Sequence, residues 1–417
     1  MGSSSLTNNQ TTLRADGVEL RLFIEELACN ICRFAHASKD QIAPQSVRIK
    51  REVQLGTPDA FADIVVHAPR ANYIVEVVYG HSLDRVSESI SRKYQRELDW
   101  FGGISKLIVI FDRDNHPDQP QLERHVRALI PKHWELELWD EHELLARVRE
   151  HFGVSVDSLQ PAALQDVRLA IDRAKGTYAF GDGYENSSLD AALLWHLGYW
   201  RLREAFRSAN SNKREILPPA TYRAVAVVFA DLSGFSGYVR DTPHEHTIRD
   251  CLTAFSSRSR YQIINNGGML YQFLGDAVIG FFGIPDHVDR YVDDALDCAR
   301  DLLMLGESVS NEWQRQLDRI QPVRGSHIGV ALGDLQLLSL RPFSRTHLGA
   351  IGDVINMAAR LSAFAKPGQI VVSNLVYRAL ADDTQRLLRE SEPVEAKNVG
   401  NIKAWLYEGR HGHDVRG

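Results

Sequence analysis

The sequence has few cysteines, no long apolar run and no excess of positive charge, and each absence excludes a class of protein. Four cysteines among 417 residues are too few for a disulfide framework. No apolar segment approaches the roughly 20 residues needed to cross a bilayer. The net charge of -6 gives no general attraction to nucleic acid or to anionic lipid. These features predict a soluble cytoplasmic protein with no membrane partner and no nucleic-acid partner.

The chain is long enough to bury a large core, and its patterns divide it into segments. Residues 1–16 are polar, lack the apolar core of a signal peptide, and are expected to form a flexible tail, as are residues 411–417. Strand and helix patterns alternate over residues 17–154, which predicts a small α/β domain. Residues 155–217 are expected to be a helical linker that ends where paired prolines stop a helix.

Residues 218–410 form the third segment, and their pattern predicts a ferredoxin-like α+β domain. A strand over residues 224–230 precedes a helix over residues 247–264 and then a hairpin with an acidic turn. An apolar helical stripe from Val292 to Leu303 follows. Strands are expected at residues 326–332 and 336–340, which completes the order β-α-β-β-α-β.

Two acids in this segment stand at the ends of apolar runs. Asp231 ends the run in AVAVVFADLSGFS, and Asp276 lies between the apolar runs of MLYQFLGDAVIGFF. A carboxylate at the end of a buried strand is costly unless a cation or several hydrogen bonds compensate it. The pair therefore indicates a metal centre, and the alternative is that both acids only cap turns.

Three motifs occur in an order that resembles the catalytic domain of class III adenylate and guanylate cyclases. FADLSGFS resembles the first metal motif of that family, FLGDAV the second, and AIGDVINMAARL the helix that carries an Asn-x-x-x-Arg pair. The resemblance covers roughly the last half of the chain. It implies an enzyme that joins the ribose 3′-oxygen of a nucleoside triphosphate to the α-phosphorus and releases pyrophosphate. A nucleotide sensor without enzymatic activity is the alternative for this fold.

The resemblance also implies a role for each matched residue. Asp231, Asp276 and the backbone carbonyl of Leu232 would bind two Mg2+ or Mn2+ ions per active site. Asn356 would orient the ribose, and Arg360, on the same helical face, would stabilise charge on the transferring phosphorus. The phosphate-binding set comprises the backbone amides of Ser233, Gly234, Phe235 and Ser236 and the side chain of Lys397, for which an ordinary surface lysine is the alternative.

A single catalytic segment has a further implication in this family. Its metal residues and its Asn/Arg pair come from opposite subunits, so the resemblance implies a homodimer with two composite sites related by two-fold symmetry.

The residues expected to recognise the base depart from the adenylate and guanylate cyclase pattern. The two positions hold Gln272 and Gly349, where the family usually has a Lys or Glu and an acidic, Cys or Thr side chain. A glutamine amide can pair with uracil or, flipped, with cytosine, and Tyr238 or Tyr271 could reach the smaller ring. The chain is thus similar to the pyrimidine cyclases of bacterial Pycsar anti-phage systems, with cyclic UMP favoured over cyclic CMP and a separate effector reading the product. A divergent adenylate cyclase is the alternative.

The N-terminal segment has its own pair of acids. Asp63 in FADIVV and Glu76 in YIVEVV lie on neighbouring predicted strands, which resembles the restriction-endonuclease-like fold. The position expected for the lysine of that fold holds Val78. A degenerate domain used for sensing or assembly is therefore expected, and a metal-dependent nuclease is the alternative.

Overall fold

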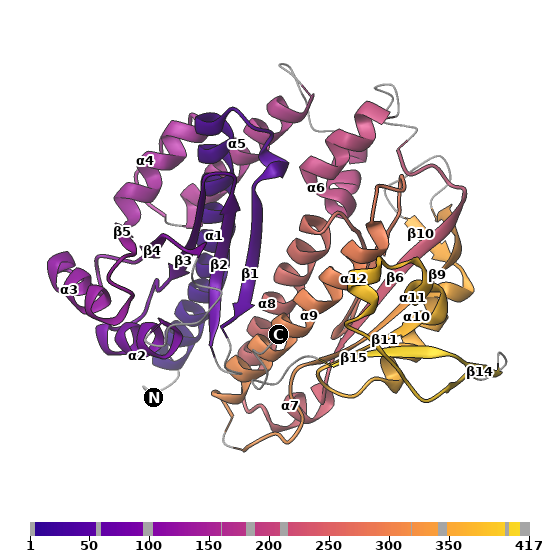
Figure 1. Cartoon of the computed structure of the whole chain (residues 1–417). Helices are drawn as coiled ribbons and strands as arrows, with labels where there is room; N and C mark the ends of the chain where they lie inside the picture. The colour runs from indigo at the N-terminus through magenta and orange to yellow at the C-terminus, as the bar shows by residue number, and fades with distance from the viewer. Residues whose placement is uncertain are drawn as a thin grey trace. The chain divides into compact units, whose positions relative to one another are not determined.

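The computed structural model describes residues 5–55, 60–94, 103–159, 161–180, 188–208, 216–317, 319–340, 348–396 and 400–408. Contacts between Cα atoms divide the chain into an N-terminal unit, residues 1–182, and a C-terminal unit, residues 183–417. Each unit has its own sheet and its own hydrophobic core. Figure 1 labels their helices and strands.

The N-terminal unit contains a mixed five-stranded sheet in sequential order. Its strands are β1 (Arg48–Gln54), β2 (Phe61–Ala68), β3 (Ala71–Val77), β4 (Lys106–Ile110) and β5 (Glu135–Trp139). The first three strands pair antiparallel, whereas β3, β4 and β5 pair parallel. Strands and helices alternate here as the sequence pattern indicates, because apolar β-branched residues bounded by turn residues are a strong local signal.

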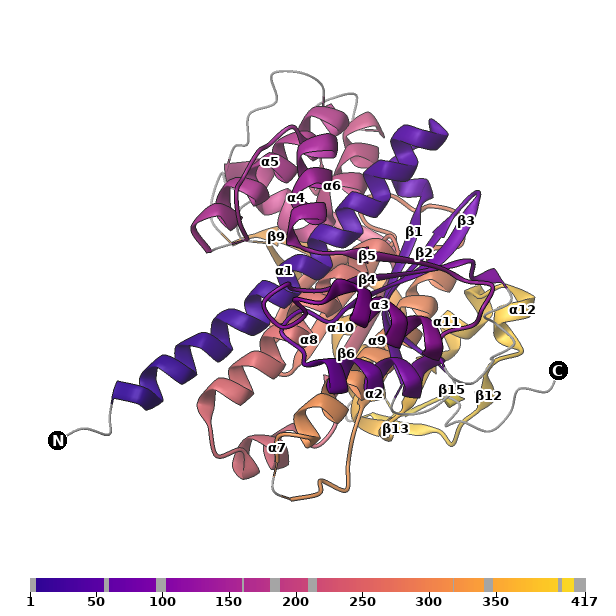
Figure 2. The same cartoon turned by 90° about the vertical axis from the view of Figure 1, so that its left-hand side faces the viewer.

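Helices cover this sheet. The longest, α1 (Ser5–Asp40), contacts β2 and β3 and can be followed in Figure 2. Residues of α2 (Leu83–Tyr94) and α3 (Gln119–Leu129) join the hydrophobic core of the sheet. The remaining elements are η1 (Pro44–Ser46), α4 (Glu141–Phe152) and α5 (Pro161–Phe180). The helix α1 begins at Ser5, so residues 5–16, which lie in the range expected to be a tail, are helical.

The C-terminal unit begins with α6 (Ser188–Ser208), followed by an eight-stranded sheet. The central strands are β6 (Thr221–Leu232), β7 (Met269–Leu274), β8 (Ala277–Phe282) and β9 (Ser326–Ser339). Their order is β9-β6-β8-β7, and all neighbouring pairs are antiparallel. This is the sheet order of the predicted ferredoxin-like α+β domain. The strand β9 is continuous where the sequence predicts two strands.

Helices pack on this sheet through apolar side chains. The pair α8 (Glu245–Asn265) and α9 (Tyr291–Gln314) supplies much of the core, together with β6, β8 and β9 (Figure 1). The helix α10 (Asp353–Phe364) lies against β9 and β6, and α7 (Phe235–Asp241) follows β6 directly. The other elements are β10 (Leu348–Ile351), β11 (Gln369–Ser373), α11 (Asn374–Ala379), α12 (Asp382–Gln385), β12 (Arg389–Glu390), β13 (Val394–Ala396), β14 (Gly400–Ile402) and β15 (Ala404–Glu408).

The range expected as a helical linker, residues 155–217, contains α5 in the N-terminal unit and α6 in the C-terminal unit. Across the part of the chain that the structure describes, no helix combines the length and the apolar character needed to span a bilayer.

Candidate active site

Asp231 and Asp276 meet where two neighbouring strands end. Asp231 is opposite Ala277 in the β6 and β8 pairing, so the preceding residue, Asp276, lies next to it. The backbone amide of Leu232 donates to the carbonyl of Asp276 at 3.4 Å. The two carboxyl groups are close enough for each to influence the pKa of the other. The structure thus brings together the two acids that the sequence singles out.

The closeness of the two acids changes their protonation. Partial burial raises the pKa of Asp231 above its ordinary value. Partial burial and then the charge of Asp231 raise the pKa of Asp276 to about 6. Two carboxylates this close cannot both be ionised without a penalty, and the protonated partner donates to the ionised one. A divalent cation removes that penalty, and carboxylate and carbonyl oxygens are donors that suit Mg2+ and Mn2+. The donor set therefore fits the expected metal.

Metal affinity is expected to fall as the pH falls through about 6. A proton shared by Asp231 and Asp276 competes with the cation, because a carboxyl must ionise before it binds metal. Below that pH, affinity should decrease by about tenfold per unit for each proton displaced. Titration of the apoprotein with Mn2+ between pH 5 and pH 8 measures this, and Asp297→Asn, an exposed substitution on α9, is the matched control. A pH-independent affinity would contradict the shared proton.

The raised pKa also gives the sign of a stability effect. The folded apoprotein holds the shared proton more tightly than the unfolded chain does, so this pair favours folding less as the pH rises from about 4 through about 6. Asp276→Asn removes the repulsion, and we expect it to raise the apoprotein's Tm at pH 7.5 while weakening metal binding.

The turn after β6 differs in one respect from the predicted phosphate cradle. Gly234 has φ 74°, a conformation that favours glycine, and α7 begins immediately after it. The backbone amide of Ser233 donates to the carbonyl of Gly325 at 2.9 Å, so it is already used within the fold. The prediction for the Ser233 amide was therefore wrong. The amides of Gly234, Phe235 and Ser236 have no acceptor among the described residues, so they stay candidates.

His327 is a site residue that the sequence motifs did not identify. It is opposite Asp231 in the β6 and β9 pairing, with its Nε2 3.5 Å from the Asp231 Oδ2. Its Nδ1 is 2.9 Å from the Ser233 hydroxyl. Burial lowers the pKa of His327, so the ring is neutral at neutral pH. An ionised Asp231 can only accept, which favours the proton on Nε2 and a hydroxyl of Ser233 that donates to Nδ1. The ring therefore links the carboxyl group of Asp231 to the turn that follows β6.

Asn356 and Arg360 are on α10, which packs backbone to backbone on β9. A Cβ at Gly329 would lie 2.0 Å from the carbonyl oxygen of Ala358, so glycine permits this approach. The Ser362 hydroxyl donates to the carbonyl of His327 at 3.1 Å, which joins α10 to the strand beside Asp231.

The side chains of this pair are available to a ligand. Asn356 is exposed and Arg360 is half-buried. Neither side chain has a hydrogen-bond partner among the residues that the structure describes.

The two positions expected to recognise the base belong to neighbouring segments. Gln272 on β7 is half-buried, and its amide has no partner within the described ranges. The hydroxyl of Tyr271 accepts from the amide of Ala350 at 3.0 Å, which connects β7 to the residue after Gly349. Tyr271 also stacks on Phe281, with 4.7 Å between ring centroids. The hydrogen bond thus joins the residue before Gln272 to the residue after Gly349.

Two other predicted residues do not take part as expected. Tyr238 is 2% exposed and packs against Trp313 with ring centroids 5.2 Å apart, so its ring belongs to the core. The prediction that Tyr238 contacts the base was wrong, because α7 turns that side chain inward. Lys397 lies outside the described residues.

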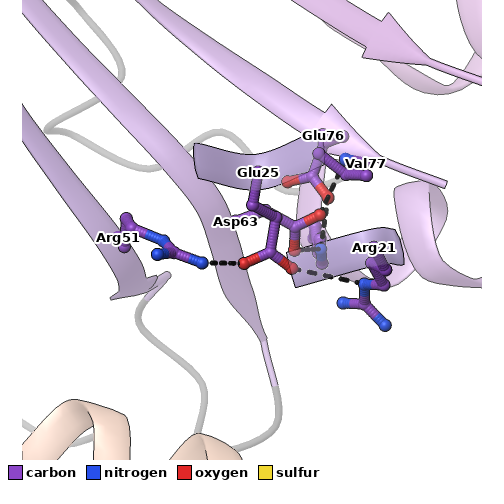
Figure 3. A network of polar contacts seen from close by, with 7 residues as sticks. Arg21, Glu25, Arg51, Asp63, Glu76 and Val77 are labelled. Carbon is purple, nitrogen blue, oxygen red and sulfur yellow. Dashed lines mark hydrogen bonds and ion pairs between the residues drawn. The ribbon is translucent and has the colours of Figure 1, made fainter. Parts of the chain in front are cut away.

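The N-terminal acids form a second cluster, shown in Figure 3. Asp63 and Glu76 lie next to each other at the end of the β2 and β3 pairing, as the sequence predicts. Lys93 of α2 donates to Asp63 Oδ1 at 3.2 Å and to Glu76 Oε2. The other Asp63 oxygen accepts from the amide of Val77 at 2.8 Å, and Glu76 Oε1 accepts from the Tyr94 hydroxyl. All four carboxylate oxygens are therefore bonded within the fold.

The ammonium of Lys93 occupies the space between the two acids, although the position at Val78 lacks a lysine. Burial and the charge of Asp63 raise the pKa of Glu76. Burial opposes ionisation of Asp63 too, but the charges of Lys93 and Arg21 and the hydrogen bond from the Val77 amide together outweigh it and lower the pKa of Asp63. A second set, in which Glu25 of α1 accepts from Arg51 and pairs with Arg21 at 3.4 Å, lies beside it (Figure 3). A lysine thus lies beside the two acids, but it comes from the helix α2 and not from the strand that carries Glu76.

Removal of the Lys93 charge is expected to destabilise the N-terminal unit. Lys93→Met leaves two buried carboxyl groups unpaired, a change that costs about 3 to 5 kcal/mol in comparable buried pairs. Hydrogen exchange of the β2 and β3 amides measures the loss. Exposed Lys132→Met is the matched control and should leave exchange unchanged. Exchange in Lys93→Met that matches the wild type would refute the pairing.

The C-terminal unit is similar to known proteins. Residues 217–409 match the family model described as the adenylate and guanylate cyclase catalytic domain. An uncharacterized protein of Mycobacterium tuberculosis (strain H37Rv) is 30% identical over 246 residues, which cover 55% of this chain and 44% of that protein. A protein of the same organism named adenylate cyclase is 26% identical over 215 residues, which cover 50% of this chain and 43% of that protein. The chain thus spans less than half the length of these curated relatives.

Solved structures with some likeness include two cyclases. The guanylyl cyclase Cya2 matches with a TM-score of 0.39 and 20% identity over 45% of this chain and 93% of that one. The adenylyl cyclase CyaB from P. aeruginosa matches with a TM-score of 0.38 and 20% identity over 46% of this chain and 99% of that one.

Proposed function

We propose that residues 217–409, which form a nucleotide cyclase catalytic domain, convert a pyrimidine nucleoside triphosphate into its 3′,5′-cyclic monophosphate and pyrophosphate. UTP is the favoured substrate over CTP. The observation that carries the proposal is the pair of neighbouring strand-end acids, Asp231 and Asp276, whose pKa values are both raised. Such a pair is unfavourable in the apoprotein and becomes favourable when a cation binds.

The matched residues divide the reaction between them. The ribose 3′-oxygen bonds to the α-phosphorus, the bond from that phosphorus to the pyrophosphate oxygen breaks, and the 3′-hydroxyl proton leaves to solvent. Two Mg2+ or Mn2+ ions held by Asp231, Asp276 and the Leu232 carbonyl would neutralise the triphosphate and lower the pKa of the hydroxyl. Asn356 would orient the ribose. Arg360 would donate to the phosphoryl oxygens as their charge increases in the transition state.

A homodimer supplies the two halves of each site in this proposal. Four large apolar side chains are exposed on segments close to the site residues, namely Leu274, Leu340, Ile351 and Phe364. A set of exposed apolar side chains beside a polar site is typical of an interface. A second copy related by a two-fold axis would cover them and would bring Asn356 and Arg360 to the partner's acids.

The pyrimidine preference rests on Gln272 and Gly349. A glutamine amide offers one acceptor and two donors, which match the O4 and N3-H of uracil. Gly349 has no side chain to hold a purine edge, and a Cβ there would lie 2.8 Å from Leu340 Cδ2. A divergent adenylate cyclase is the second candidate, which the adenylate cyclase name of a relative favours. In the proposed role, the cyclic nucleotide is a messenger in anti-phage defence that a separate effector reads.

Supplying each of the four ribonucleoside triphosphates with Mn2+ and identifying the products by mass spectrometry tests the substrate. Cyclic UMP as the main product is expected, with less cyclic CMP. Turnover of ATP alone would establish the adenylate cyclase alternative, and no product from any of the four would refute the enzymatic proposal.

For the N-terminal unit, we propose a non-catalytic domain of the degenerate restriction-endonuclease-like kind, used for sensing or assembly. The supporting observation is that Lys93, Tyr94 and the Val77 amide occupy every oxygen of Asp63 and Glu76. The expected result is that plasmid DNA stays intact with Mg2+. Nicking that Asp63→Ala abolishes would establish the nuclease alternative.

A further inference from the structure

The helix α6 precedes the residues that match the cyclase family, yet it is attached to the catalytic sheet. It is interrupted at Gly198, which has φ 67° and ψ 174°. A Cβ at Gly198 would lie 2.7 Å from Ile264 Cγ2 on α8. Two features therefore favour glycine at this position: the left-handed backbone conformation and the close approach of α8.

The interruption leaves two carbonyl groups of α6 without helical donors, and a side chain of α8 donates hydrogen bonds to them. A non-helical residue at position 198 removes the helical donors for the carbonyls before it. Arg260 of α8 donates from Nη2 to the Leu194 carbonyl at 2.8 Å and from Nε to the Trp195 carbonyl at 3.0 Å. Its guanidinium lies 5.0 Å from the centroid of the Trp195 ring. The break in α6 is thus built into the packing of the unit.

The same stretch of α6 reaches the strand that carries Gln272. His196 is 8% exposed, and its Nδ1 lies 2.6 Å from the carbonyl oxygen of Leu270 on β7. A carbonyl can only accept, so Nδ1 carries the proton, and burial lowers the pKa of His196 and keeps the ring neutral. Because β7 is the last of the described strands in its sheet, α6 supplies this bond at an edge that no described strand covers.

The point of attachment is an irregularity in the strand. Leu270 is opposite Gly280 and Gln272 is opposite Ile279, so Tyr271 is an extra residue that forms a bulge. On the other side of this bulge, Phe273 meets Trp195 edge to face with ring centroids 6.4 Å apart. The helix therefore contacts β7 on both sides of Tyr271 and Gln272.

We propose that His196 and Trp195 are positioning residues for base recognition, which hold the bulged part of β7 so that Gln272 presents its amide to the base. Neither residue touches the substrate in this role, and the proposal rests on the proposed function for its catalytic consequence. Loss of the His196 bond leaves the Leu270 carbonyl without its donor and lets the bulge shift. Discrimination between bases then falls, while the acids Asp231 and Asp276 keep their places.

His196→Leu in the full chain, with His196→Asn as the conservative variant, tests the proposal. An asparagine amide can place a donor where Nδ1 is, whereas leucine cannot. We expect His196→Leu to speed hydrogen exchange of the residue 269–274 amides and to lower the ratio of UTP to ATP turnover by about tenfold. His196→Asn should restore both. Val309→Ala, which removes core methyl groups on α9, is the control and should lower Tm without changing the ratio.

The two readouts separate this proposal from the proposed function. A wild type that makes no cyclic product refutes the proposed function, whereas hydrogen exchange still tests whether His196 holds β7. Unchanged exchange in His196→Leu would overturn the inference. Faster exchange with an unchanged substrate ratio would equally overturn it, because the bond would then have only a structural role.

Discussion

Asp231→Asn is expected to reduce cyclic nucleotide formation by at least about a thousandfold. The substitution keeps the shape of the side chain but removes the charge that would hold both cations. The neighbouring acid, Asp276, cannot replace it, because one carboxylate has half the charge and half the oxygen donors of the pair. Initial rates with UTP and Mn2+ measure the effect.

The same variant should keep its fold, which makes the loss interpretable. Removing one member of a pair that shares a proton relieves repulsion, so the apoprotein's Tm should not fall. Asp297→Asn, an exposed change on α9, serves as the control and should retain wild-type rates. Activity in Asp231→Asn within tenfold of the wild type would show that this acid does not hold the metal.

Arg360→Ala is expected to lower kcat by about 10²- to 10³-fold with little change in KM. The guanidinium would act mainly when charge accumulates on the transferring phosphoryl group, so its loss affects the transition state more than substrate binding. Steady-state kinetics with UTP separate the two parameters. Exposed Arg378→Ala on α11 is the matched control and should not alter either value.

A rise in KM with an unchanged kcat would assign Arg360 to ground-state binding instead. The fold should tolerate the change, because the side chain has no hydrogen-bond partner among the described residues. Ala358 and Leu361, which are buried, continue to hold α10 against the sheet.

The strands and helices that the sequence predicts well have strong local patterns. Apolar runs bounded by glycine or by acids gave the central strands, and the spacing of apolar residues gave α8 and α9. Asp231, Asp276, Asn356 and Arg360 are predicted as site residues because each lies in a short contiguous motif.

The residues that sequence reasoning missed or misplaced depend on long-range contacts. His327 reaches Asp231 through the register of β6 and β9, which no local motif encodes. Lys93 reaches Glu76 from a helix, whereas the strand motif places the expected lysine at the position of Val78. Tyr238 was misplaced because the start of α7 at Phe235 turns its ring towards Trp313.

Backbone groups raise the same difficulty. The Ser233 amide was expected to bind phosphate, yet it donates to the carbonyl of Gly325, a residue far along the chain. A sequence can indicate a turn that suits an anion, but the partner of each amide depends on the tertiary fold. The proposed composite site would likewise be a property of two chains, which a motif implies only through resemblance.

Mixing two inactive variants tests the central claim most directly. In the proposed composite site, Asp231→Asn lacks a metal-binding carboxylate, and Arg360→Ala lacks the guanidinium that the other subunit contributes. Each mixed dimer has one intact site of two, so mixed dimers purified through two tags should have about one half of wild-type activity, and the unseparated mixture about one quarter. Co-expression with two affinity tags, followed by the UTP assay, measures this. Purified mixed dimers that remain as inactive as either parent would contradict a site shared between two subunits.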